Sequence, residues 1–197
     1  MGGYHMDYFI SDLHLWHDHV LSFDNRPFKD LDEMHATIID NWNNAVDDYD
    51  DVYFLGDLSF AGYEKTKEVV DELHGRIHLI LGNHDRKILK SKLRDRFVEI
   101  CEYKQLDIDS NTSVILCHYP MPTFKNMYRG WHHLYGHVHN SFEHNMMNRM
   151  KNELKDLYAK KDGKKPEDVC SMHNVGCMIG YMNYTPRTLE YILENDL

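Results

Sequence analysis

Residues 8–14 read YFISDLH, an apolar run that ends directly in Asp12 and His14. Three further runs have the same form, at residues 52–57 (VYFLGD), 77–85 (IHLILGNHD) and 114–118 (VILCH). Each is short, apolar and followed by Asp, Gly, Asn or His, which is typical of a strand that ends at a functional rim. In open α/β sheets, binding residues gather beyond the carboxyl ends of the strands. The pattern therefore predicts an α/β fold with a site on loops along one edge.

Seven side chains of metal-ligand type follow these runs or lie in the later GHVH stretch at residues 136–139. They are Asp12, His14, Asp57, Asn83, His118, His137 and His139. Carboxylates, an amide oxygen and neutral imidazoles can share two divalent cations about 4 Å apart, which can clamp the attacking and leaving oxygens of a phosphoryl transfer. Any one of these motifs could be an ordinary turn, but their joint order predicts a two-metal hydrolase centre.

Most of the remaining histidines need no such role, because a lone histidine is usually a surface or core residue. The chain has 15 histidines. We interpret the following as structural: His5, His35, His74, His78 and His144.

At 197 residues the chain suits one domain that can bury a core without disulfides or a structural metal. It has 22 Lys+Arg against 32 Asp+Glu, and this net charge of -10 argues against a broad basic face and so against stable duplex nucleic-acid binding. Two bound divalent cations would make the mouth of the site locally positive, so an anionic phosphate ester remains a suitable substrate.

The four cysteines show no Cys-x-x-Cys spacing, and we expect them to be reduced in a cytoplasmic protein. No stretch approaches the roughly 20 apolar residues of a membrane span, and the N-terminus lacks the pattern of a signal peptide. We therefore expect no membrane association. Residues 1–5 precede Met6 and are treated as a leader outside the domain.

Helix signals are clearest after Asp30, which forms a capping-box pattern with Glu33 and precedes apolar residues at helical spacing, so a helix over 31–46 is predicted. Pro186 is expected in the first turn of a terminal helix over 189–193. The other expected elements are shorter helices at 64–73 and 86–93, and strands at 99–108, 111–117, 134–135 and 174–177.

The segment 141–168 stands apart as a polar, helix-prone and Met-rich insertion at the periphery of the domain. A helix of this kind could form a lid or a dimer surface. We favour the simpler interpretation, in which it packs on the core.

The chain resembles the calcineurin-like metallophosphoesterase superfamily over residues 8–139. The matching blocks are Asp12-x-His14, Gly56-Asp57, Gly82-Asn83-His84-Asp85, His118 and Gly136-His137-x-His139. A narrower likeness to small single-domain bacterial and phage members rests on shorter blocks. These are residues 10–12 (ISD), 25–28 (NRPF), 41–43 (NWN), 117–120 (CHYP) and 174–176 (NVG).

This resemblance implies a four-layer α/β/β/α sandwich with a dinuclear site on loops at the strand ends. It implies a first metal held by Asp12, His14 and His139, a second held by Asn83, His118 and His137, and Asp57 as the bridge between them. His84 would face the substrate instead of binding metal, and Asp85 would orient the His84 ring.

The residue types agree with this chemistry. Two oxygens allow the Asp57 carboxylate to bridge, and a hydroxide shared by the cations could attack phosphorus near neutral pH because metal charge lowers the pKa of bound water. A protonated His84 could donate to the leaving alkoxide. His137 and His139 are two residues apart and would point to opposite faces of a strand, so a local turn must bring both to the metals.

Two residues near the ligand loops are candidates for substrate binding. His17 could offer a further imidazole to the phosphate, although an exposed loop histidine is an equal alternative. Arg26 suits bidentate phosphate contact, and we favour it slightly over other cations. Those cations are Arg86, Lys125 and Arg129. Nearby aromatic residues could stack a base, but such residues more often belong to the core or walls. They are Trp16, Phe28, Tyr119, Phe124 and Trp131.

The predicted activity is that of a dinuclear phosphodiesterase acting on nucleotide or nucleic-acid-derived esters. Two divalent ions are the expected cofactors: the mixed nitrogen and oxygen ligands suit Mn²⁺, Fe²⁺, Zn²⁺ or Ni²⁺ better than Mg²⁺, and we expect Mn²⁺ to support activity. The alternatives are a phosphomonoesterase or protein phosphatase, and a scaffold with the same fold that has lost catalysis. Retention of the whole ligand set argues against the scaffold.

Overall fold

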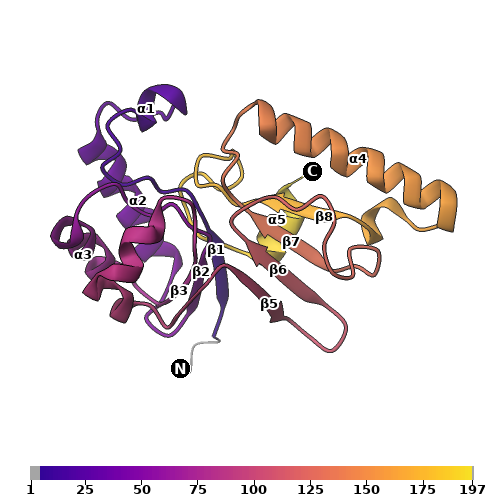
Figure 1. The fold of residues 1–197 in the computed structure, drawn as a ribbon, viewed down its shortest axis with the longest axis horizontal. Coiled ribbons are helices and arrows are strands. Elements are labelled where there is room, and N and C mark those ends of the chain that lie inside the picture. Colours follow the sequence, from indigo (N-terminus) through magenta and orange to yellow (C-terminus); the bar gives the residue numbers. More distant parts are fainter. Residues whose placement is uncertain (1–4, 197) are drawn as a thin grey trace.

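The computed structural model describes residues 5–196 and shows two β-sheets packed face to face between helices (Figure 1). Of the leader predicted at residues 1–5, only His5 lies within the described part of the chain. The first sheet has the order β4 (Glu99–Cys101), β3 (Arg76–Ile80), β2 (Asp51–Phe54), β1 (Asp7–Ile10) and β9 (Arg187–Thr188). The second has the order β5 (Tyr103–Asp107), β6 (Ser113–Cys117), β7 (His132–Tyr135) and β8 (Ser171–Asn174). Within each sheet the strands pair in parallel, except β9 and β5 at one edge.

Helices cover the outer faces of both sheets, which confirms the predicted four-layer α/β/β/α sandwich. In Figure 1, α2 and α3 lie beside the first sheet and the long α4 flanks the second. The α-helices are α1 (Val20–Phe23), α2 (Leu31–Ala45), α3 (Tyr63–Glu72), α4 (Phe142–Asp162) and α5 (Leu189–Asn195). The 3-10 helices are η1 (Asp85–Lys90), η2 (Lys92–Arg96) and η3 (Pro166–Asp168).

Helix α2 forms where the capping pattern predicts it. The Asp30 side chain accepts the Glu33 N–H at 2.9 Å, and the Glu33 carboxylate accepts the Lys29 N–H at 2.7 Å, so two otherwise unpaired donors are satisfied. Met34 and Trp42 lie on the buried face of the helix. The helix is thereby anchored on the first sheet and holds the strand ends from one side.

The central strands are largely buried because both of their faces are covered. Phe9 in β1, Leu79 in β3 and Leu116 in β6 are completely buried in the main core. This continuous packing gives the loops beyond these strands a rigid base.

Helix α4 begins inside the segment 141–168 and packs on the second sheet. Its Met147 is buried in a small cluster with Tyr135, Val138 and Met172. Phe142 and Leu157 remain 69% and 61% exposed, so the rest of the helix contributes little to the core. This contact agrees with the packing interpretation of the segment.

Three sequence expectations were wrong in detail. The run 99–108 is not one strand: β4 belongs to the first sheet and β5 to the second, with the crossing at Glu102. The strand expected at 174–177 lies at Ser171–Asn174, because β8 pairs with the whole length of β7. Pro186 lies outside the terminal helix, since Thr188 caps that helix by accepting the Tyr191 N–H.

None of the helices in the described chain is both long and apolar enough to cross a membrane. All four cysteines are free thiols, as predicted.

His133 in β7 makes the stability of the second sheet dependent on pH. Its ring is fully buried, with Nδ1 donating to the Ile115 carbonyl and Nε2 accepting the Met121 N–H, each at 3.0 Å. Protonation would turn the acceptor into a second donor that faces an N–H. Burial accordingly lowers the pKa of His133 from 6.5 to about 4.

We expect acidification to destabilise the protein through His133. Between pH 6.5 and 4 the unfolded chain binds a proton at His133 and the folded chain does not. The free energy of unfolding therefore decreases by about 1.4 kcal/mol for each unit by which the pH is lowered. Urea unfolding in EDTA should show that the wild type loses about 2 kcal/mol more stability than His133→Gln between pH 7 and pH 5, because burial likewise lowers the pKa of His132 to about 4 and that residue contributes equally in both proteins. Equal pH dependence of both proteins would contradict this assignment.

Candidate metal centre

All seven predicted ligand residues lie on one rim of the sandwich, just beyond the carboxyl ends of the strands. The loops after β1, β2 and β3 in the first sheet meet those after β6 and β7 in the second. Six of these residues form two groups whose ligand atoms lie within 4.8 Å of one another in each group. The first ligand group is Asp12, His14 and His139, and the second is Asp57, His118 and His137.

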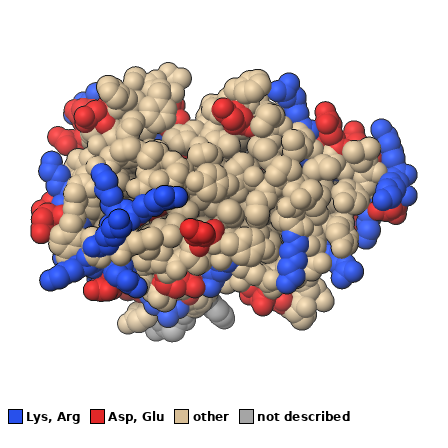
Figure 2. All heavy atoms as spheres, viewed as in Figure 1, with Lys and Arg blue, Asp and Glu red and all other residues tan. Residues whose placement is uncertain are grey.

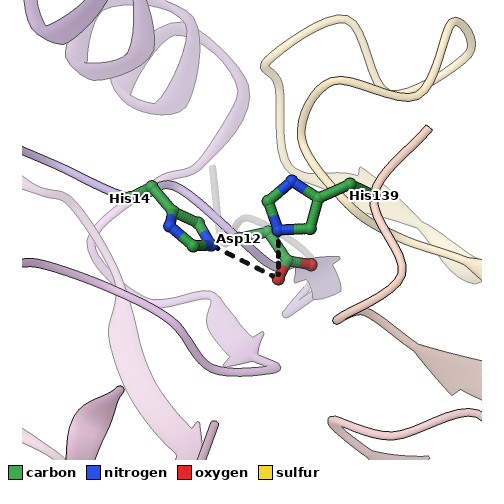
Figure 3. A group of neighbouring side chains, drawn as sticks. All are labelled: Asp12, His14 and His139. Atoms are coloured by element: carbon green, nitrogen blue, oxygen red, sulfur yellow. Dashed lines mark ion pairs between the residues drawn. The ribbon is translucent and has the colours of Figure 1, made fainter. Parts of the chain in front are cut away.

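In the first ligand group both imidazoles point to one carboxylate (Figure 3). The Nε2 atoms of His14 and His139 lie 3.8 and 3.7 Å from Asp12 Oδ1. These separations are too long for hydrogen bonds, but two ligands that are each about 2.1 Å from a shared cation lie roughly 3 to 4 Å apart. The arrangement therefore suits a cation between the three side chains.

The second ligand group gathers around His118. Its Nε2 lies 3.5 Å from Asp57 Oδ2 and 3.1 Å from Asn83 Oδ1, so the seventh predicted ligand points to the same place. His118 Nδ1 donates to the Leu55 carbonyl at 2.6 Å. That bond fixes the ring and leaves Nε2 free to bind a metal.

Asp57 lies between the two groups. Its Oδ2 is 3.5 Å from His14 Nε2 of the first group and 3.5 Å from His118 Nε2 of the second. The side chain is almost fully buried, and Oδ1 is held by the His84 backbone N–H at 3.0 Å. One carboxylate oxygen thus faces both positions where cations would lie.

The backbone at the centre is strained. Five ligand residues have positive φ angles although none is glycine, namely Asp12 (60°), His14 (51°), Asp57 (60°), His137 (71°) and His139 (47°). Such conformations cost of order 1–3 kcal/mol each and gather at functional sites. They also provide the local turn that the spacing of His137 and His139 required.

Two glycines let the loops approach the carboxylates. A Cβ on Gly82 would lie 2.3 Å from Asp57 Oδ1, and a Cβ on Gly136 would lie 2.3 Å from Asp12 Oδ2. Both distances are far below van der Waals contact. Any larger residue at either position would displace a ligand.

The residues present fit a pair of divalent cations. Both ring nitrogens of His14 are buried without a hydrogen-bond partner, which is costly unless a ligand satisfies them. Burial raises the pKa of Asp12, but the neighbouring imidazoles outweigh burial and hold that pKa well below its usual range. Burial lowers the pKa of His118, whereas Asp57 and Asp12 raise it to about 9. The carboxylates thus favour positive charge at this point, which cations would supply.

The calcineurin-like phosphoesterase profile matches residues 8–195, nearly the whole chain. The chain belongs to this family. The predicted resemblance is thereby confirmed, and the two ligand groups are consistent with the metal site of a metallophosphoesterase.

Relatives occur in an archaeon and in phages. The chain is 38% identical over 134 residues to "Uncharacterized protein MJ1445" of Methanocaldococcus jannaschii. The aligned region covers 67% of this chain and 68% of that protein. It is 36% identical over 81 residues to "Gene 66 protein" of Mycobacterium phage L5, covering 40% of this chain and 39% of the phage protein. "Gene 66 protein" of Mycobacterium phage D29 is 31% identical over 132 residues, covering 57% of this chain and 63% of its own length.

A solved structure has the same fold. The "Protein of Unknown Function AQ665" from Aquifex aeolicus superposes with a TM-score of 0.62 over 97% of this chain and 99% of its own. Its sequence identity of 21% supports the fold alone.

His84 lies at the mouth of the phosphoesterase site and is not part of either ligand group. Its side chain is 42% exposed, and its Nε2 is 3.9 Å from Asp57 Oδ2. Phe60 packs against the His84 ring at 4.6 Å and against the His14 ring at 5.4 Å. This contact of Phe60 was not predicted, because nothing in the local sequence distinguishes Phe60 from a core residue.

Asp85 does not orient the His84 ring, contrary to the expectation. Its carboxylate accepts the backbone N–H groups of Asp57, Leu58 and Gly82 at 2.8 to 3.0 Å, and within the described chain none of its hydrogen bonds reaches His84. Burial raises the pKa of Asp85, partly opposed by these bonds. Asp85 therefore ties the Asp57 loop to the Gly82 turn.

Arg26 is not available to a substrate, which corrects the prediction made for it. Its side chain is fully buried and donates to the carbonyls of Leu13 and Asp12 at 2.8 Å and to Asp24 at 2.9 Å. Asp24 in turn contacts His139 Nδ1 at 3.0 Å. Arg26 thus positions ligand residues through Asp24.

Asp24 was missed because its only sequence signal is the spacing Asp24-x-Arg26, which is common on protein surfaces. The carboxylate fixes the His139 ring so that Nε2 faces Asp12. Ser11 has a similar role, since its hydroxyl donates to Asp12 Oδ2 at 2.6 Å.

His17 lies beside the centre without joining either group. Its ring packs on Phe60 at 4.2 Å and approaches His14 at 5.8 Å, and its Nδ1 is buried without a partner. Burial lowers the pKa of His17, so the ring favours the neutral form. It is close enough to the mouth to remain a candidate for substrate contact.

A third possible ligand grouping lies at the opposite end of the strands. It contains His5, Asp7 and Asp51. The Asp51 carboxylate there is already satisfied by Arg76 at 2.7 Å and His78 at 3.0 Å. This grouping is therefore explained by ion pairing, in agreement with the structural interpretation of His78.

Proposed function

We propose that this protein is a dinuclear-metal phosphodiesterase acting on nucleotide or nucleic-acid-derived esters. The observation that carries the proposal is the position of His84, an exposed imidazole next to the carboxylate shared by the two ligand groups. Since His84 Nε2 is 3.9 Å from Asp57 Oδ2 and outside both groups, it is free to act on a substrate bound there. Diesters need such a proton donor most, because their leaving alkoxides are poor.

The proposed function assigns a role in metal binding, proton transfer or phosphate contact to each residue of the site. Asp12, His14 and His139 would hold one cation, and Asn83, His118 and His137 would hold the other, with Asp57 near both. When bound, the two cations supply Lewis acidity and a nucleophile at neutral pH. His84 then donates a proton to the leaving oxygen, while His17 offers a second imidazole to the phosphate. Phe60 limits water on one side of the His84 ring.

The donor set favours transition metals. Imidazole nitrogens dominate both groups, and the oxygens come from two carboxylates and one amide. Such a set suits Mn²⁺, Fe²⁺, Zn²⁺ or Ni²⁺ better than Mg²⁺, and we expect Mn²⁺ to support activity. We also propose that residues 1–197 form one domain, with residues 1–5 as a leader and residues 141–168 as a peripheral helical insertion.

Metal analysis followed by assays on matched aryl phosphates tests this function. We expect about two cations per chain after Mn²⁺ loading and gel filtration, and a higher kcat/KM for bis(p-nitrophenyl) phosphate than for p-nitrophenyl phosphate. A preference for the monoester would instead indicate a phosphomonoesterase. Bound cations without turnover at saturating Mn²⁺ would indicate a scaffold.

A further inference from the structure

Basic residues are concentrated next to the metal centre although the protein as a whole is acidic. The basic strip, as we call it, consists of Arg86, Lys87, Lys90, Lys92, Arg94 and Arg96 in η1 and η2. All six are exposed, and they belong to a chain whose net charge is -10. Figure 2 shows Lys and Arg side chains gathered on the face that carries η1 and η2 in Figure 1.

Most of this charge is not neutralised by the protein. Arg96 pairs with Asp71 at 2.7 Å. The side chains of the other five basic residues have no ion pair or hydrogen bond with any described residue. Five exposed cations without partners make this face locally positive, which favours anionic ligands over the rest of the acidic surface.

The strip begins at the catalytic rim. Residue 86 follows His84 by two positions, and Arg86 and Lys90 line a cavity of about 640 Å³ that also includes the metal-ligand candidate Asn83. The same cavity is lined by Tyr103 and Tyr119. The cavity therefore adjoins Asn83, which contacts His118 of the second ligand group, and its wall on the η1 side is cationic.

The two tyrosines that line the cavity have exposed rings. Tyr103 is 47% exposed and Tyr119 is 45% exposed. The Tyr119 ring lies 4.7 Å from the His137 ring, so it adjoins a metal-ligand candidate directly. Tyr103 in β5 pairs with Cys117 in β6, and Tyr119 follows Cys117 by two residues. Exposed rings beside a cationic wall are the combination that binds unstacked bases and their phosphates.

We propose that the substrate is single-stranded nucleic acid, bound with its backbone along the basic strip and with one base in the cavity against Tyr103 and Tyr119. This inference depends on the proposed phosphodiesterase function for the place where the strand is cut. Arg86 and Lys90 contact the phosphates nearest the metal centre, and Lys92 and Arg94 contact those farther along. Such a site would span about four nucleotides, at the short end for single-strand grooves.

A duplex fits this surface poorly. Its bases are stacked inside the helix and cannot reach the tyrosines, and the acidic remainder of the protein repels a second strand. A chain of phosphates without bases would use the strip but leave unused the aromatic wall that Tyr103 and Tyr119 form. The tests below separate these ligands.

Binding to the Mn²⁺-loaded protein is measured by fluorescence anisotropy with a labelled phosphorothioate oligothymidylate, which resists hydrolysis. Arg86→Ala/Lys90→Ala should raise Kd at least about tenfold and reduce the slope of log K against log salt by about 1.4, or 0.7 per lost phosphate contact. The matched control is Lys160→Ala/Lys161→Ala, which removes the same charge from the far end of α4 and should change Kd less than about twofold. Equal loss in both double variants, or none in the first, would overturn the strip as a binding site.

The aromatic wall is tested with Tyr103→Ala. We expect Kd for oligothymidylate to rise at least about fivefold and Kd for an abasic strand of equal length to stay unchanged, because only bases stack. Tyr49→Ala, at an 85% exposed tyrosine, is the control and should have no effect. Wild-type protein that binds the abasic strand or a duplex as tightly as oligothymidylate would overturn the single-strand assignment.

Turnover separates this proposal from the function on which it rests. Hydrolysis of bis(p-nitrophenyl) phosphate by the wild-type protein tests the phosphodiesterase function by itself, because this small diester has no further nucleotides that could lie along the strip. If the wild-type protein hydrolyses no diester but the binding differences hold, the proposed function fails and the strand site stands. If diester hydrolysis is present and the double variant binds oligothymidylate normally, the strand site alone fails.

Discussion

Asp57→Asn is expected to abolish turnover and to lose both cations at once. The Asp57 carboxylate is nearly fully buried, and its Oδ2 is 3.5 Å from an imidazole of each ligand group. Asparagine has almost the same shape, but its amide carries no charge, and its single oxygen cannot both accept the His84 N–H and face the two cation positions. The loss of activity should exceed the roughly 10- to 100-fold decrease that follows removal of a residue that only orients a metal ligand.

Asp24→Asn provides the matched control for that comparison. Asp24 is also a buried aspartate, but it contacts the His139 ring and Arg26 without belonging to either ligand group. We expect this variant to keep two cations with weaker affinity and to lose about 10- to 100-fold in turnover. Calorimetric titration with Mn²⁺ and bis(p-nitrophenyl) phosphate hydrolysis measure both quantities. Asp57→Asn protein that binds two cations as tightly as wild type would show that Asp57 is not the bridge.

His84→Ala is expected to leave both cations bound and to slow the hydrolysis of diesters with poor leaving groups by about 10²- to 10⁴-fold. The reason is that the ring lies at the mouth of the site, 42% exposed, where it can donate to a departing alkoxide. The effect on bis(p-nitrophenyl) phosphate should be much smaller, because p-nitrophenolate leaves without a proton. The contrast between the two substrates distinguishes loss of a proton donor from general damage.

The control for this second prediction is His19→Ala, since His19 is another exposed histidine near the same rim. This variant should leave the rates of hydrolysis of alkyl and nitrophenyl diesters unchanged. An equal decrease for alkyl and nitrophenyl diesters in His84→Ala would assign His84 to substrate positioning instead of proton transfer.

Much of the metal centre could be predicted because its signals are local. Asp12 and Asp57 each follow an apolar run in the first sheet, and parallel strands of one sheet end at the same edge. The helix at 31–46 was predicted for the same reason, since Asp30 and Glu33 cap it within four residues. The family assignment used only the order of such motifs.

The partners of the ligands could not be predicted. Arginine is a residue type that often binds phosphate, yet Arg26 is buried and forms an ion pair with Asp24. Asp85 follows His84 in the chain, yet its carboxylate faces the backbone of Asp57. In each case the contact depends on where distant loops meet, and adjacency in sequence carries no information about that.

By itself, the sequence determined which segments form most of the strands and helices, the order of the metal-ligand residues, and the family to which the chain belongs. Tertiary structure alone decided that the run 99–108 divides between two sheets, that Arg26 is buried against Asp24, and that the basic strip borders a cavity with exposed tyrosines. The physical reason is that strand and helix preferences arise from neighbouring residues, whereas the second group of features depends on packing. Two sheets must cover each other to exclude water, and the closure of that core determines which loops share the rim.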